Sequence, residues 1–67
     1  MNIPESLEKA YKIKGKKQTE LAAGINVTRS YVSAVENSVK PASIGFIQKC
    51  STFFGMSVSD FIKLGED

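Results

Sequence analysis

The chain has 67 residues, 42% of them hydrophobic and 24% charged, with a formal net charge of +2 at pH 7. A chain this short is one domain at most (residues 1–67), and it buries only about 60% of the surface that its unfolded form exposes. One cysteine and no histidine exclude an intrachain disulfide and remove the usual general base and the commonest metal ligand, so neither an enzyme nor a cofactor or metal site is expected.

The spacing of apolar residues and helix-ending residues predicts five short helices and no strands. The first helix is expected from about Pro4 to Lys14, because proline suits a first helical turn and Leu7 and Ala10 recur at helical spacing. Gly15 follows as a natural C-cap.

The second helix is expected from Gln18 to Ile25. Asn26 can end it in a left-handed conformation, Val27 can point inward from the turn, and Thr28 is a strong N-cap for the next helix. The third helix therefore begins at Arg29 and ends between residues 36 and 38.

The fourth helix follows Pro41, with Ser43 as its cap, and ends before Gly55. One line of its residues is expected to face the core: Ile44, Ile47, Cys50, Ser51 and Phe54. The stretch SVSD at residues 57–60 predicts the start of a fifth helix, whose apolar residues are Phe61, Ile62 and Leu64 and which Gly65 ends.

A second apolar line on the fourth helix runs through Phe46, Cys50 and Phe53. Two interpretations stay open for Phe46 and Phe53: the first and fifth helices cover them, or they form a contact between two copies in a dimer.

Positive charge is concentrated in the first part of the chain. Seven cationic side chains lie between Lys9 and Lys40 against Glu20 and Glu36, and the rest of the chain is net acidic. A solvated lysine-rich face would explain this, but the segregation also fits a face turned towards an anionic polymer. Acids near the N-terminus and the lack of a run of roughly 20 apolar residues favour a soluble cytoplasmic protein with no membrane contact.

Two short helices joined by a tight turn are typical of a helix-turn-helix, in which the second helix enters the major groove of DNA. The stretch QTELAAGINVTRSYVSAVENSVKPAS, residues 18–43, resembles the Cro/CI-type helix-turn-helix family of phage and bacterial repressors, also called the xenobiotic-response-element class. The resemblance covers about residues 12–64 and implies a compact, all-α, five-helix fold like that of lambda repressor. Asn26 and Ser38 stand where the family commonly has glycine, and the loop that leads to Pro41 is one residue shorter than the family's usual loop.

The resemblance also implies roles for individual residues. Arg29, Ser30 and Ser33 should contact bases, and arginine can donate two bonds to guanine as lysine cannot. Ala34 offers only a small apolar contact, and Glu36 is expected to be structural, as the partner of a nearby cation or helix end. The residues expected to contact phosphates are Gln18, Tyr31, Asn37, Lys16, Lys17 and Lys40.

The sequence thus predicts a sequence-specific DNA-binding transcription regulator, a repressor that binds a palindromic operator as a homodimer. Within the same class, a restriction–modification controller-type activator or an antitoxin-like regulator is an alternative; activation would require a contact with RNA polymerase. A different alternative is a helical protein-interaction module that has lost DNA binding, which the single arginine favours.

Overall fold

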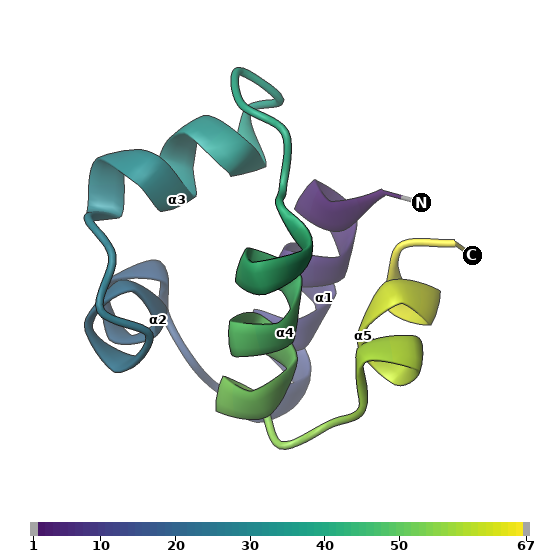
Figure 1. Cartoon of the computed structure of the whole chain (residues 1–67). Coiled ribbons are helices and arrows are strands. Elements are labelled where there is room, and N and C mark those ends of the chain that lie inside the picture. The colour runs from purple at the N-terminus through teal and green to yellow at the C-terminus, as the bar shows by residue number, and fades with distance from the viewer. Residues whose placement is uncertain (1, 67) are drawn as a thin grey trace.

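A computed structural model describes residues 2–66 and contains five helices (Figure 1). They are α1 (Ile3–Lys14), α2 (Gln18–Gly24), α3 (Arg29–Glu36), α4 (Ile44–Phe53) and α5 (Val58–Leu64). No strand occurs among these residues, so the expected all-α, five-helix class is confirmed. The predicted helix ends are right to within one or two residues. No helix in the described part of the chain is long and apolar enough to cross a membrane.

Side-chain caps fix where four of the helices begin. Asn2 accepts a hydrogen bond from the Glu5 backbone N–H at the start of α1. The hydroxyl groups of Thr28, Ser43 and Ser57 do the same for α3, α4 and α5. Each cap satisfies one of the backbone donors that a helix leaves unpaired in its first turn, so polar residues in the sequence set these boundaries.

Left-handed residues fix where the first four helices end. Gly15, Asn26, Ser38 and Gly55 have φ angles of 64°, 59°, 60° and 70° after α1, α2, α3 and α4. In each case the next residue donates its N–H to a carbonyl five positions earlier, as in Val27 N to Ala22 O at 3.0 Å, which is the Schellman arrangement. The chain therefore turns sharply after each of these helices without needing a long loop.

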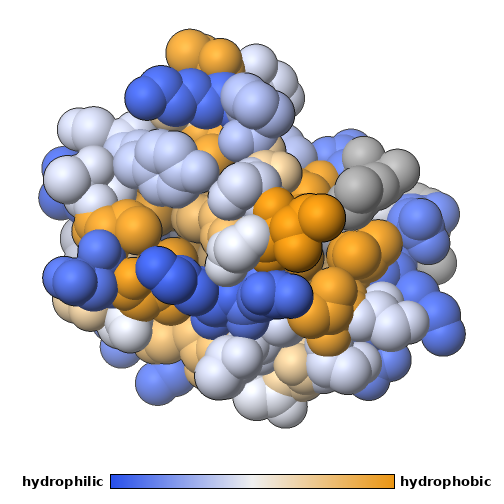
Figure 2. All heavy atoms as spheres, viewed as in Figure 1, coloured by the Kyte–Doolittle hydropathy of each residue, from blue (hydrophilic) through white to orange (hydrophobic). Residues whose placement is uncertain are grey.

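The face that α4 turns towards the core differs from the expected one. Ile44, an expected core residue, is 74% exposed, whereas Phe46 is 4% exposed. Ile44 is the first residue of α4, where the helix extends past the core, and Phe46 takes the inner position instead. Figure 2 shows hydrophobic side chains gathered on the surface where α4 faces α5.

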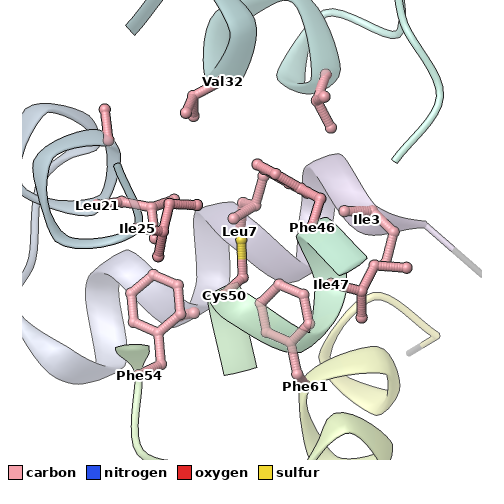
Figure 3. Packing of buried hydrophobic residues seen from close by; sticks show 13 residues of the cluster. Ile3, Leu7, Leu21, Ile25, Val32, Phe46, Ile47, Cys50, Phe54 and Phe61 are labelled. Atoms are coloured by element: carbon pink, nitrogen blue, oxygen red, sulfur yellow. The ribbon is translucent and has the colours of Figure 1, made fainter. Parts of the chain in front are cut away.

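All five helices contribute to one hydrophobic core (Figure 3). Leu7 of α1 and Cys50 of α4 lie at its centre and have no exposed surface. Leu21 and Val32 come from α2 and α3, and Phe61 comes from α5. Because α2 and α3 each bury one face in this shared core, their relative orientation is set by the rest of the domain.

A close backbone approach joins the first and last helices. A Cβ atom on Gly65 would collide with the backbone oxygen of Asn2 and with the hydroxyl group of Ser6. The Ser6 hydroxyl group also donates a hydrogen bond to the Ile62 carbonyl at 3.4 Å. The C-terminal end of α5 therefore packs directly on the start of α1.

Candidate nucleic-acid interface

The turn between α2 and α3 has the form that the sequence predicts. Asn26 takes the left-handed conformation, and Val27 packs against the core as a partly buried side chain. The Thr28 hydroxyl group accepts the Tyr31 N–H at 3.1 Å, so α3 begins at Arg29. This turn holds α2 and α3 as a helix-turn-helix pair, with Arg29 and Ser30 in the first turn of the second helix.

The outer face of α3 is polar at one end and apolar at the other. Arg29 and Ser30 are exposed, Ser33 and Ala34 are half-buried, and the opposite face is fixed by Val32 in the core. A shallow concavity follows this face, and its lining residues are Gln18, Arg29, Ser30, Ser33, Ala34, Asn37 and Val39. The fold thus brings together all three residues predicted to contact bases and two of those predicted to contact phosphates. Val39 is an addition that the sequence does not predict.

Glu36 links three helices at the edge of this face. Its carboxylate accepts a hydrogen bond from the Tyr11 hydroxyl group at 2.5 Å and another from the Gln18 side-chain amide at 2.7 Å. Both donors are uncharged, so the expected cation is absent among the described residues, although the expected link to a helix end is present. The network ties the last residue of α3 to the first residue of α2, and it occupies one amide proton of Gln18.

Asn37 turns back onto α3. Its side-chain amide donates to the Ser33 backbone carbonyl at 2.9 Å and to the Ser33 hydroxyl group at 3.2 Å. The amide caps the last turn of the helix and holds the Ser33 hydroxyl group in place on the outer face. A contact of this amide with a phosphate would compete with one of its two bonds to Ser33.

Tyr31 connects the interface to the core. Its ring meets the ring of Phe46 edge to face, with 5.3 Å between the centroids. The Lys40 ammonium group lies 5.8 Å from the centre of the Tyr31 ring, within the range of a cation–π contact. Tyr31 therefore positions a cation from the α3–α4 loop beside the outer face of α3.

Within residues 2–66, no ion pair neutralises the positive charge around this face. Lys16 and Lys17 are exposed in the connection before α2, and Arg29 is exposed at the start of α3. The ion pair found within residues 2–66 joins Glu8 to Lys12, at 3.4 Å, on the exposed surface of α1. Glu20 accepts a hydrogen bond from the Lys17 backbone N–H at 2.9 Å, which caps α2.

The two residues considered for a dimer contact lie in or against the core. Phe46 is buried, and its ring packs edge to face against Tyr31 of α3. Phe53 is half-buried, and its ring lies so close to Gly24 of α2 that a Cβ atom there would displace it. Phe46 is therefore a core residue with almost no surface for a dimer contact, and Phe53 packs against α2.

Two side chains in or near the core have raised pKa values. Burial, then the hydrogen bond to Glu36 and its negative charge, raises the pKa of the Tyr11 hydroxyl group well above its usual value. Burial, followed by the charge of Glu36, raises the pKa of the Cys50 thiol to about 12. Both groups therefore stay protonated near neutral pH. Residues 2–66 contain no group of three side chains suited to hold a metal ion.

Comparison with known proteins identifies the class that this geometry suggests. A family model described as helix-turn-helix matches residues 7–61, which span α2, the turn and α3 together with most of the remaining fold. The chain belongs to this family of Cro/CI-type helix-turn-helix proteins, which are DNA-binding transcription regulators and not typically enzymes. A comparison with curated proteins finds no match.

Proposed function

We propose that residues 1–67 form a single DNA-binding domain that acts in the cytoplasm as a repressor, with α3 in the major groove of a palindromic operator. The observation that carries this proposal is the outer face of α3. Arg29 and Ser30 are exposed there side by side, while the nearby Glu36 carboxylate is engaged by Tyr11 and Gln18. The face therefore offers hydrogen-bond donors and positive charge to the edges of bases.

Arg29 is the residue proposed to carry most of the base recognition. Its guanidinium group can donate two parallel bonds to O6 and N7 of guanine, a contact worth about 1–3 kcal/mol of discrimination. Lys16, Lys17 and Lys40 would add attraction to phosphates that does not depend on sequence.

Selection of bound sequences from random DNA tests the proposal, followed by salt titrations on the selected site. The logarithm of the affinity should fall with the logarithm of the salt concentration by about 0.9 per phosphate contact. Arg29→Lys keeps the charge and should retain most of this slope, but lose preference at one base pair. Arg29→Ala should lose the preference at that base pair and reduce the slope by no more than about 0.9, because the lysines still contact phosphates.

Lys63→Ala is the control, because Lys63 lies on α5, outside the residues that line the α3 concavity. It should leave the base preference unchanged. A flat salt response, or a protein partner lost in Arg29→Ala while DNA binding is unaffected, would instead favour a helical protein-interaction module.

The operator complex is proposed to contain two copies of the chain. An eight-residue α3 is only about 12 Å long and spans few base pairs, whereas dimers read half-sites about 34–36 Å apart. The domain measures 26 × 22 × 20 Å, so two touching copies reach this separation when they meet on the side away from α2 and α3. Figure 1 shows α5 on the side of the molecule opposite α2. The exposed apolar side chains of Ile44 in α4 and Val58 in α5 support a contact between the two copies.

A further inference from the structure

An exposed apolar side chain borders the face that is proposed to read DNA. Val39, in the loop between α3 and α4, is 74% exposed and lines the same concavity as Arg29, Ser30 and Ser33. Figure 2 shows hydrophobic atoms at the top of the molecule, where Figure 1 places this loop. Most of the other residues that line the concavity are polar.

The loop backbone holds Val39 at a fixed place. Ser38 is in the left-handed conformation, with a φ angle of 60°. The Val39 N–H donates to the Ala34 carbonyl at 2.8 Å, and the Lys40 N–H reaches the same oxygen at 3.2 Å. Val39 is therefore anchored next to Ala34, and the two side chains form the apolar end of the α3 face.

The stability of the free domain does not explain why an exposed valine occupies position 39. In the Schellman arrangement, the two residues at the positions that Val39 and Ala34 occupy here often make an apolar contact. Such a contact would bury the valine, but most of its surface remains open to water. An apolar group fixed on a binding face and left in water points to an apolar group on the ligand.

Among the base edges in the major groove, the C5-methyl group of thymine is the apolar feature. We infer that Val39 is a specificity-determining residue, which together with Ala34 contacts the methyl group of one thymine in each half-site. This inference rests on the proposed DNA binding. Arg29 precedes Ala34 by five residues, which is about 7.5 Å along the helix axis. The thymine should therefore belong to a different base pair from the one that Arg29 reads, within a few base pairs of it.

Replacing single thymines by deoxyuridine tests this inference, because the replacement removes the methyl group alone. In the selected site, one such replacement should weaken binding of the unaltered protein about three- to five-fold, the effect of one buried methyl group. Val39→Ser should weaken binding to the thymine site by a similar factor. The affinity of this variant should then be the same for the thymine site and the deoxyuridine site. At that position, 5-methylcytosine opposite guanine should bind more tightly than cytosine.

Ile13→Ser is the matched control, since Ile13 is a 60% exposed aliphatic residue on α1 that does not line the concavity. It should respond to deoxyuridine as the unaltered protein does. The thermal midpoint of Val39→Ser should stay within a few degrees of the original, which separates a lost contact from a lost fold.

The possible failures are distinct. If every deoxyuridine replacement leaves binding unchanged, or affects the unaltered protein and Val39→Ser equally, Val39 does not read a methyl group, although Arg29-dependent binding can still hold. If selection yields no preferred DNA sequence, both the proposed function and this inference are overturned.

Discussion

At the scale of single residues, Glu36 has a structural role that its neighbours in sequence do not reveal. Its carboxylate accepts hydrogen bonds from Tyr11 of α1 and Gln18 of α2, so one side chain holds three helices in register. A hydrogen bond to a charged acceptor contributes about 1.5–3 kcal/mol, more than a neutral one. The angle between α2 and α3 should therefore depend on this carboxylate.

Removing one donor should measure that contribution. Tyr11→Phe should lower the free energy of unfolding by about 1–3 kcal/mol, because the ring still packs on Phe54 while the carboxylate loses one partner. Urea denaturation checks the value, and a double-mutant cycle with Glu36→Gln should give a non-zero coupling energy. Strict additivity of the two changes would contradict a functional network.

Cys50 should make the fold sensitive to alkaline pH. Its pKa rises from about 9.0 to about 12 on folding, so the folded protein keeps a proton that the unfolded chain releases. This contribution to stability is complete below about pH 9 and is lost as pH rises towards 12. Denaturation at a series of pH values should show a steeper alkaline loss for the unaltered protein than for Cys50→Ala, and equal slopes would contradict the assignment.

At the scale of elements, the same turn recurs after α1, α2, α3 and α4 with three kinds of residue. Glycine occupies the left-handed position after α1 and α4, asparagine after α2 and serine after α3. Asparagine adopts the left-handed conformation at a small energetic cost, whereas the same conformation strains the backbone at a serine. The end of α3, next to the proposed reading face, is therefore the least favourable of the four.

Replacing that serine should stabilise the domain. Ser38→Gly is expected to raise the free energy of unfolding by about 1 kcal/mol, and Asn26→Gly should change it less. Thermal or urea denaturation compares the two variants. A loss of stability in Ser38→Gly would mean that the serine side chain makes a contribution larger than the strain it causes.

The helices themselves are predictable because their ends depend on local chemistry. Thr28, Ser43 and Ser57 cap helices through bonds to residues three positions away, so the sequence alone is enough to place them. The inward face of α4 is less predictable. Two apolar lines compete on that helix, and the choice of Phe46 over Ile44 depends on the position of Tyr31 in α3.

The candidate site also contains one part that the sequence predicts and another part that it does not. Helical spacing and the turn are sufficient to predict that Arg29, Ser30 and Ser33 share one face of α3. The partners of Glu36 lie 18 and 25 positions away, so only tertiary packing brings them together. Val39 lies in a loop, where no periodicity assigns a direction to its side chain; the signal that could have found it is the left-handed turn at Ser38.

At the scale of the whole molecule, the proposed dimer should depend on the exposed end of α4. Ile44→Asp should shift sedimentation towards the monomer and weaken operator binding at least ten-fold, because a buried carboxylate would replace an apolar contact. The monomer should remain folded, since Ile44 is already 74% exposed. Ile13→Asp, at a 60% exposed position on α1, is the matched control and should leave sedimentation unchanged.

An equal effect of both substitutions would indicate a general loss of solubility or fold. No effect of Ile44→Asp on sedimentation or binding would place the contact between the two copies elsewhere.

The close approach of Gly65 to Asn2 means that the path of the chain almost closes on itself. A short linker between these two points would convert it into a ring without bending any helix. Opening that ring in the exposed connection between α1 and α2 would give a new chain order while preserving every contact in the core. The arrangement of α2 and α3 in space is thus a property of the packed helices, and not of the order in which they are synthesised.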